Sequence, residues 1–142
     1  MKTQNSIWVI LAVGLLLSSC ELDGLTDDDI VIGRMLEGTW QCDEESSIFK
    51  STNSFYDVTI EADQADSAKI IIFNFYQLGL TESVTAFISG STVRINQQVV
   101  DGYTVSGNGT VSKDLNTIEW SYTTFDGADT DNVTATYTYK EN

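Results

Sequence analysis

From Gly38 to the end of the chain, apolar and polar residues alternate with a period of two over one short run after another. This period places successive side chains on opposite faces of a β-strand. In one such run, Tyr56, Val58 and Ile60 alternate with polar residues. The whole chain contains no proline, which favours long, uninterrupted strands. The pattern predicts eight strands, over residues 39–45, 56–62, 69–76, 84–88, 93–95, 103–111, 118–122 and 133–139.

The connections between these runs are short, and one of them carries the turn pair Gly90-Ser91. Short connections favour antiparallel pairing of strands that follow each other in sequence. We therefore expect an all-β fold, a single antiparallel up-and-down barrel of roughly eight strands. A two-sheet β-sandwich is the alternative. A short helix is expected before the barrel, over residues 30–36, with Asp29 as its N-cap.

The first residues predict a secretory signal peptide. Lys2 precedes an apolar run, Ile7 to Leu17, that is too short to span a bilayer, which takes about 20 residues. The run ends in Leu17-Ser18-Ser19-Cys20, which resembles the lipobox of bacterial lipoproteins. The resemblance implies that Cys20 becomes the first residue of the mature chain and carries a diacylglycerol and an N-acyl chain, which together anchor the protein stably to a membrane. An ordinary signal peptide with an incidental cysteine is the alternative.

This interpretation divides the chain into a signal peptide (1–19), an acidic tether (20–29) and one β domain (30–142). Glu21 follows the cysteine, where an aspartate would indicate retention in the inner membrane, so the outer membrane is the expected location. The acidic residues of the tether resemble the surface-export signals of Bacteroidota lipoproteins. A solvated acidic linker explains them equally well, so the periplasmic and the surface-exposed face both stay open.

Composition excludes several classes of function. The chain has 7 basic and 21 acidic residues and a net charge of −14, which disfavours nucleic acid and anionic lipid as partners. It has no histidine, and so lacks the commonest general base and the usual zinc and copper ligand. Once Cys20 is acylated, Cys42 is the only thiol, and its place beside Trp40 in a strand predicts a small buried residue. We expect no enzyme and no cofactor beyond the lipid on Cys20.

The start of the first strand carries Gly38-Thr39-Trp40 after the expected short helix. This combination resembles the G-x-W motif of lipocalins, in which the tryptophan closes one end of an eight-stranded barrel. The lipocalin T-D-Y motif has no counterpart here, and Lys140 is the only basic residue near the last strand that could stand in for the family's arginine over the tryptophan. The resemblance implies a barrel that binds a small apolar ligand inside, although a fold alone does not establish a function.

The alternation also predicts which side chains face a ligand inside the barrel. Residues 69–76 are apolar at nearly every position, and we expect Ile71, Phe73 and Phe75 to share one face. The small residues Ala86, Gly107, Gly109 and Ala135 could leave room for a cavity. The alternative is an interior filled by side chains, as in other small barrels. The candidate ligand-facing residues are Tyr56, Phe73, Phe75, Tyr103, Trp120, Tyr122 and Tyr137.

Other candidate sites have simpler explanations. Asp126, Asp129 and Asp131 crowd one loop and are the candidate ligands for a cation, but turns use the same residues for their own hydrogen bonds. No pair of carboxylates is singled out for glycoside hydrolysis. The aromatic residues Phe55, Phe87 and Phe125 fall on the outward parity or in loops, where they could bind a partner protein or a glycan.

These observations lead to two hypotheses. The first is a non-enzymatic lipoprotein of the cell envelope whose lipocalin-like barrel binds a small apolar ligand inside or a surface partner outside. The alternative is a structural or accessory envelope protein with a filled barrel and no small-molecule ligand.

Overall fold

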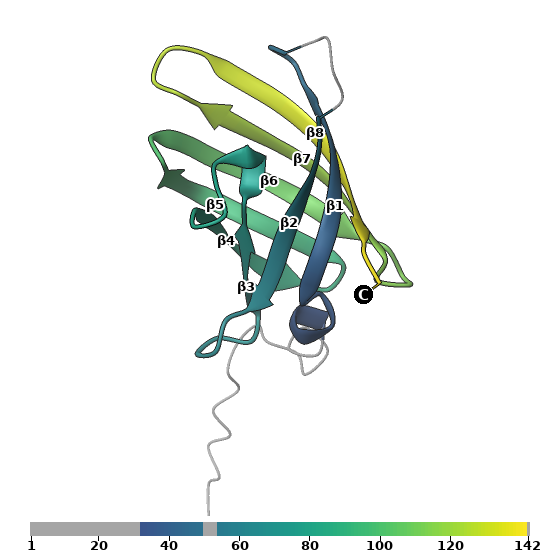
Figure 1. The fold of residues 1–142 in the computed structure, drawn as a ribbon. Coiled ribbons are helices and arrows are strands. Elements are labelled where there is room, and N and C mark those ends of the chain that lie inside the picture. Colours follow the sequence, from purple (N-terminus) through teal and green to yellow (C-terminus); the bar gives the residue numbers. More distant parts are fainter. Residues whose placement is uncertain (1–31, 50–53, 142) are drawn as a thin grey trace, which may run out of the picture.

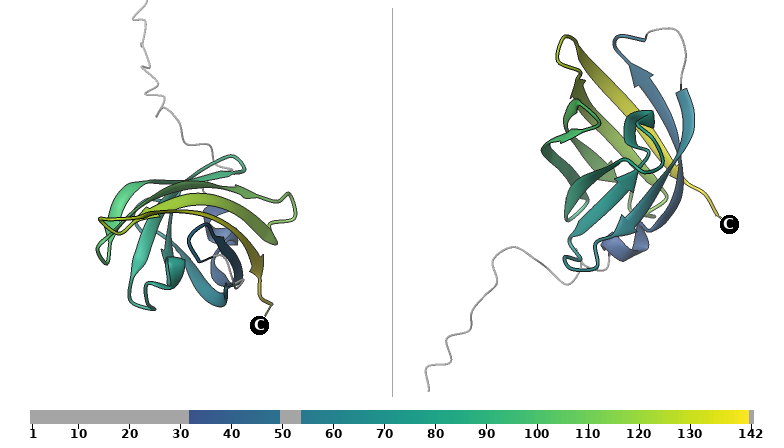
Figure 2. Two further views of the ribbon diagram at one scale, coloured as in Figure 1. Left: turned by 90° about the horizontal axis from the view of Figure 1, so that it is seen from above. Right: turned by 60° about the vertical axis from the view of Figure 1, so that its left-hand side comes forward.

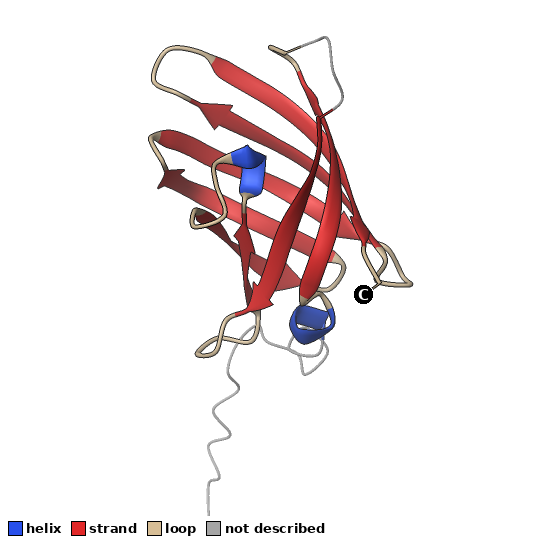
Figure 3. Cartoon of the chain, in the orientation of Figure 1, coloured by secondary structure: helices blue, strands red, loops and turns tan. Residues whose placement is uncertain are grey.

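A computed structural model describes residues 32–49 and 54–141. The described chain is all-β, with helical turns only at residues 32–35 and in the 3₁₀ helix η1 (Phe75–Gln77) (Figure 3). The expected N-cap Asp29 and the start of the expected helix lie outside the described residues. The strands are β1 (Gly38–Ser46), β2 (Ser54–Ala62), β3 (Lys69–Phe73), β4 (Ser83–Ser89), β5 (Thr92–Val100), β6 (Tyr103–Val111), β7 (Thr117–Phe125) and β8 (Thr130–Tyr139).

The eight strands form a closed barrel in sequence order, each pairing antiparallel with the next (Figure 1). β1 also pairs antiparallel with β8, from Trp40 opposite Tyr139 to Ser46 opposite Val133, and this pairing closes the sheet. Seen from above, the strands wrap around a common interior (Figure 2). The predicted up-and-down barrel is therefore confirmed, and the two-sheet alternative is wrong. Closure gives every strand a partner on both sides, so no strand is an edge along its whole length.

Trp40 closes the end of the barrel at which the helical turn lies. Its side chain is fully buried, and its indole Nε1 donates a hydrogen bond of 2.9 Å to the carbonyl of Leu36. The ring of Tyr139 packs edge-on against it, with the ring centroids 5.2 Å apart. A Cβ at Gly38 would lie only 2.8 Å from that ring, so a glycine is needed there. Tyr139, and not Lys140, packs against the tryptophan ring. The Nζ of Lys140 lies 2.8 Å from the carboxylate of Asp57.

One inward-facing prediction is wrong. In β3, Ile70 and Ile72 are fully buried in the core, whereas Phe73 is half-buried on the opposite parity, opposite Thr59 and Ser83. The strand is apolar at almost every position, so the period of two does not reveal which face is buried. The pairing register with β2 and β4 decides it, because Val58, Ile60 and Val84 belong to the core.

β3 ends at Phe73 and does not continue to Tyr76, because the next residues leave the strand conformation. Asn74, Tyr76 and Gln77 all have positive φ values, of 60°, 52° and 56°. Such values are uncommon for residues other than glycine and break the period of two. The turn reverses the parity at this point, so Phe75 enters the core although Phe73 does not. It also carries Tyr76 to the end of the barrel opposite the helical turn, which we call the open end.

The seam between β4 and β5 is short near the open end. Backbone pairing joins Phe87–Ser89 to Thr92–Arg94, and the register of β5 with β6 shifts between Ile95 and Gln98. The side-chain amide of Gln98 bridges the gap, since its Oε1 accepts a hydrogen bond from the Thr85 N–H at 2.9 Å and its Nε2 donates to the Thr85 carbonyl at 2.8 Å. A side chain thus replaces the missing backbone pair.

Candidate functional site

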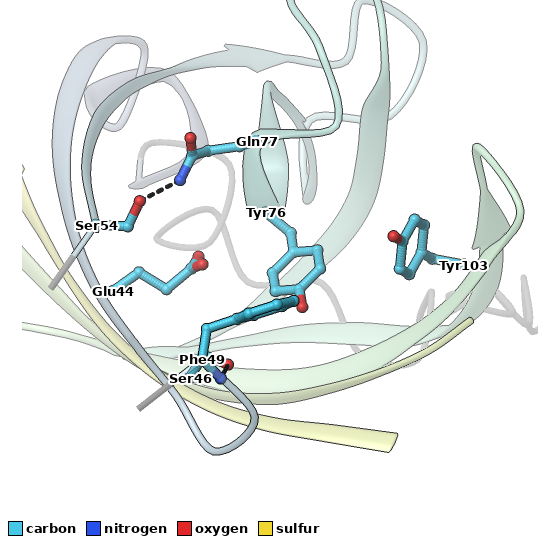
Figure 4. Close-up of a pocket in the computed structure, with 7 residues that line it drawn as sticks. All are labelled: Glu44, Ser46, Phe49, Ser54, Tyr76, Gln77 and Tyr103. Atoms are coloured by element: carbon cyan, nitrogen blue, oxygen red, sulfur yellow. Dashed lines mark hydrogen bonds between the residues drawn. The ribbon is translucent and has the colours of Figure 1, made fainter. Parts of the chain in front are cut away.

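A pocket of about 370 Å³ opens at the open end of the barrel. Figure 4 shows its lining, which comes from β1, the following loop, β2, η1 and β6 and consists of Glu44, Ser46, Phe49, Ser54, Tyr76, Gln77 and Tyr103. A larger, shallower groove of about 600 Å³ lies along the outer face of β2, but no buried polar side chain borders it. The open-end pocket is the candidate site, because the buried carboxylate of Glu44 forms part of its lining.

Glu44 is a buried carboxylate in this pocket. It follows Trp40 and Cys42 on the inward face of β1 and is only 5% exposed. The hydroxyls of Tyr56 and Tyr122 both donate short hydrogen bonds to its Oε2. No described residue donates a hydrogen bond to Oε1, and Figure 4 shows the carboxylate directed into the pocket. Burial raises the pKa of Glu44, and the hydrogen bonds from Tyr122 and Tyr56 only partly oppose this shift.

Asp131, the second buried carboxylate, has its hydrogen bonds satisfied. It is 2% exposed on β8 and accepts hydrogen bonds from the Ser46 hydroxyl at 2.6 Å, the Ser47 N–H and hydroxyl at 2.9 Å, and the Tyr76 hydroxyl at 2.8 Å. Burial alone would raise its pKa, but these donors hold the pKa below its usual value. The ionised carboxylate therefore ties the β1–β2 loop and Tyr76 to β8.

The candidate cation ligands separate into two places. Asp131 points inward, whereas Asp126 and Asp129 are exposed in the β7–β8 turn. There the Asp126 carboxylate accepts hydrogen bonds of 2.8 Å from the N–H groups of Ala128 and Asp129. The Asp126 carboxylate thus stabilises its own turn, which is the alternative to a cation site that the sequence offered. Within residues 32–49 and 54–141, no group of three or more acidic or cysteine side chains is arranged to hold a metal ion.

Aromatic rings form the wall of the pocket opposite Glu44. The rings of Tyr76 and Tyr103 meet at 67° with centroids 5.7 Å apart, and those of Tyr76 and Tyr122 meet at 89° with centroids 6.2 Å apart. Phe49 adds a further ring from the β1–β2 loop. Ring faces therefore meet at steep angles beside the free carboxylate oxygen, an arrangement that offers a ligand both apolar and polar contacts.

Between the pocket and the closed end, side chains fill the barrel. Phe75, Trp120 and Tyr137 are buried, with ring centroids 6.3 Å apart for Phe75 and Trp120 and 5.6 Å for Trp120 and Tyr137. The glycines that could have left a cavity make room for these rings instead, since a Cβ at Gly109 would lie 2.8 Å from the Trp120 ring. The nitrogen Trp120 Nε1 and the Tyr137 hydroxyl have no hydrogen-bond partner among the described residues.

Cys42 lies in the same filled region. It is fully buried, and burial raises the pKa of its thiol to about 12. A thiol with such a pKa stays protonated at neutral pH and is a poor nucleophile. The predicted role of Cys42 as a small buried residue is confirmed.

The predicted ligand-facing residues divide into groups. Tyr103 lines the pocket, and Tyr56 and Tyr122 reach it through Glu44. Phe75, Trp120 and Tyr137 belong to the packed core, and Phe73 lies outside it. Among the aromatics expected on the surface, Phe55, Phe87 and Phe125 are exposed, but Phe87 lies near the closed end, 5.4 Å from the Lys69 Nζ, and apart from the other two. The lipobox Leu17, Ser18, Ser19 and Cys20 lies outside the described residues.

Sequence reasoning missed the residues that define the site, Glu44, Tyr76 and Asp131. A signal for Glu44 was present, because it shares the inward parity of Trp40 and Cys42 on β1. Tyr76 had no such signal, since positive φ values end its strand early. Asp131 was considered only as a turn residue or a cation ligand, although it also shares the inward parity of Val133 and Ala135 on β8.

No family model, no curated protein and no solved structure matches this chain. No helix within the described residues is both long enough and apolar enough to cross a membrane.

Proposed function

We propose that this protein is a non-enzymatic, lipid-anchored lipoprotein of the outer membrane, with a lipocalin-like barrel that binds a small ligand at its open end. The observation that carries the proposal is the pocket around Glu44, in which a carboxylate oxygen that receives no hydrogen bond from a described residue lies beside aromatic rings. The pocket volume of about 370 Å³ lies within the range of small-molecule sites. The ligand combines an apolar body, which contacts Phe49 and the tyrosines, with a polar group directed at Glu44.

The anchor follows from the sequence. Leu17-Ser18-Ser19-Cys20 ends a short apolar run, and Cys20 would carry the diacylglycerol and the N-acyl chain. Each buried CH₂ of a lipid chain contributes about 0.8 kcal/mol, so more than one chain gives stable anchoring. The described chain begins at residue 32 near the closed end, so the proposed tether would join the barrel at the end opposite the pocket (Figure 1). This arrangement keeps the open end accessible to a ligand.

Native mass spectrometry of the full chain, purified from a bacterial envelope in polymer-bounded nanodiscs, tests for a ligand. We expect an added mass that disappears on denaturation. Ser54→Trp places a large ring in the pocket and should remove this mass. Ser121→Trp, on an exposed position of β7, should keep it. An added mass that survives Ser54→Trp, or a bare polypeptide in every preparation, would contradict the proposal.

The alternative is an accessory protein that binds a macromolecule at its surface. It is favoured by the filled interior and by exposed apolar side chains around the open end, among them Phe49, Phe55 and Val99, which are 66%, 62% and 71% exposed. Apolar side chains grouped around a rim are typical of contact surfaces. A bare polypeptide mass in the experiment above would favour this alternative.

A further inference from the structure

We infer that the pocket at the open end recognises a cationic amine, whose ammonium group binds Oε1 of Glu44 while aromatic rings cover the apolar body of the ligand. This inference rests on the proposed function and names the class of ligand that the site accepts. It excludes carboxylates and phosphates as preferred ligands, and it ranks a neutral alcohol of the same shape below the amine.

One oxygen of the Glu44 carboxylate, Oε1, receives no hydrogen bond from a described residue. Tyr56 and Tyr122 both donate to Oε2, so Oε1 has no donor among the described residues although the side chain is only 5% exposed. Oε1 is not one of the fully buried polar atoms, so it is accessible from the pocket that Glu44 lines. An N–H donor that carries a positive charge makes the strongest hydrogen bond to such a carboxylate oxygen. Within the described residues the one ion pair joins Lys140 to Asp57, so none of these residues gives Glu44 a cation.

Aromatic side chains line the pocket together with Glu44. Tyr76 lies 5.7 Å from Tyr103 and 6.2 Å from Tyr122, measured between ring centroids, and Phe49 borders the same space. Steep angles pack the edge of one tyrosine ring against the face of the next, and Tyr76, Tyr103 and Phe49 border the pocket. An aromatic ring face attracts an ammonium group and repels an anion. The aromatic lining and the carboxylate thus favour the same sign of charge.

The described basic residues are distributed unevenly along the barrel axis. The turns and loops at the open end carry Asp101, Asp126, Asp129 and Glu82, and Asp131 stays ionised behind Tyr76. Lys50 belongs to the β1–β2 connection and lies outside the described residues. The basic residues that the structure describes all lie toward the closed end or beside the helical turn, namely Arg34, Lys69, Arg94, Lys113 and Lys140. The charges of the described residues around the pocket mouth are therefore negative, and they attract cations and repel anions.

Isothermal titration calorimetry on the purified full chain tests the inference with probes of one shape and three charges: phenethylamine, 2-phenylethanol and phenylacetate. We expect phenethylamine to bind about tenfold or more tightly than 2-phenylethanol, the effect of one charge-assisted hydrogen bond. Phenylacetate should bind most weakly. Because these probes need no variant, the test does not depend on whether a mutant folds.

Glu44→Gln then isolates the carboxylate, because glutamine keeps the shape and an oxygen acceptor for the two tyrosines. We expect this variant to lose the preference for the amine. Glu45→Gln is the matched control, since it removes the same charge from the adjacent, exposed position, and it should keep the preference within about threefold. Circular dichroism checks that both variants are folded.

Equal binding of the amine and the alcohol by the unmodified chain, or an amine preference that survives Glu44→Gln, would overturn the inference and leave the proposed pocket standing. The same holds if a neutral sugar such as glucose binds more tightly than the amine. If none of the probes binds and the native chain carries no added mass, the proposed function itself fails.

Discussion

At the open end of the barrel, two buried carboxylates lie near each other, and the pKa of one shifts up while the pKa of the other shifts down. Burial dominates for Glu44, whose partners are two tyrosine hydroxyls on one oxygen. For Asp131, donors from Ser46, Ser47 and Tyr76 outweigh burial. Asp131 is therefore a structural anion with satisfied hydrogen bonds. Glu44 keeps one oxygen without a donor among the described residues, and this is the oxygen that the proposed ligand would meet.

Asp131→Asn should lower the free energy of unfolding at neutral pH by about 1.5–3 kcal/mol, because an amide cannot accept all these hydrogen bonds with the strength of a carboxylate. Asp129→Asn, on the exposed turn two residues earlier, should stay within about 0.5 kcal/mol of the native chain. Urea denaturation measures both. Since the folded pKa of Asp131 lies below its ordinary value of 3.8, its contribution is present in full above that pH. The contribution is lost as the pH falls through the folded pKa, so the two variants should converge in acid, and a constant difference would contradict this account.

At the scale of elements, the β6–β7 pair shows how a narrow barrel accommodates large rings. Gly107 lies opposite Tyr122, and Gly109 lies opposite Trp120, on the inward face of the sheet. These glycines are needed for lack of space and not for their backbone angles. The pairing lets Tyr122 reach Glu44 and lets Trp120 fill the interior below it, so the glycines of β6 determine both the pocket floor and the packed core.

Gly107→Ala should therefore destabilise the barrel by about 1–3 kcal/mol or more, as overpacking does. The added Cβ would lie 2.3 Å from the Tyr122 Cβ and 2.6 Å from the Ser121 carbonyl oxygen, which is backbone and cannot move aside easily. Asn108→Ala changes the adjacent, exposed residue of the same strand and should be nearly neutral. Chemical denaturation of both variants gives the comparison, and equal midpoints would show that the sheet adjusts to the extra carbon.

At the scale of the whole molecule, the two ends of the barrel differ in structure and charge. Trp40, Leu36 and Tyr139 seal one end, near which the described chain begins at residue 32. The other end holds the pocket, the buried carboxylates and a rim of acidic turns. With the proposed lipid on Cys20, the barrel would be held at its sealed end and would present its acidic, open end to the surroundings.

Cys20→Ala should release the protein from the membrane fraction and abolish metabolic labelling with radioactive palmitate. Cys42→Ala is the matched control, because Cys42 is a buried core thiol with no part in anchoring, and it should keep both the label and the membrane association. Fractionation of cells that express each variant measures the difference. A Cys20→Ala chain that is still labelled and still sediments with membranes would contradict the lipobox interpretation.

The sequence by itself determined the all-β class with antiparallel pairing of successive strands, because it has a period of two, short connections and no proline. The pairing of β1 with β8 decided for a barrel over a two-sheet sandwich. The resemblance of Gly38-Thr39-Trp40 to the lipocalin motif implied a closing position for Trp40, and the strand pattern placed Cys42 in the core. These features depend on neighbours in sequence, which periodicity reports directly.

Only the tertiary structure decided which face of β3 is buried and what occupies the interior. Phe73 and Ile72 are both apolar, so their sequence does not show which side chain is buried. The pairing register with β2 and β4 determines that it is Ile72. The pocket joins Glu44 of β1 and Tyr76 of η1, and the Tyr76 hydroxyl donates to Asp131 of β8; the three residues are distant in sequence. Their meeting depends on closure of the sheet and on the positive φ values at residues 74, 76 and 77. The pairing of distant strands and the turn after β3 do not appear in the periodicity of the sequence, because packing across the barrel determines them.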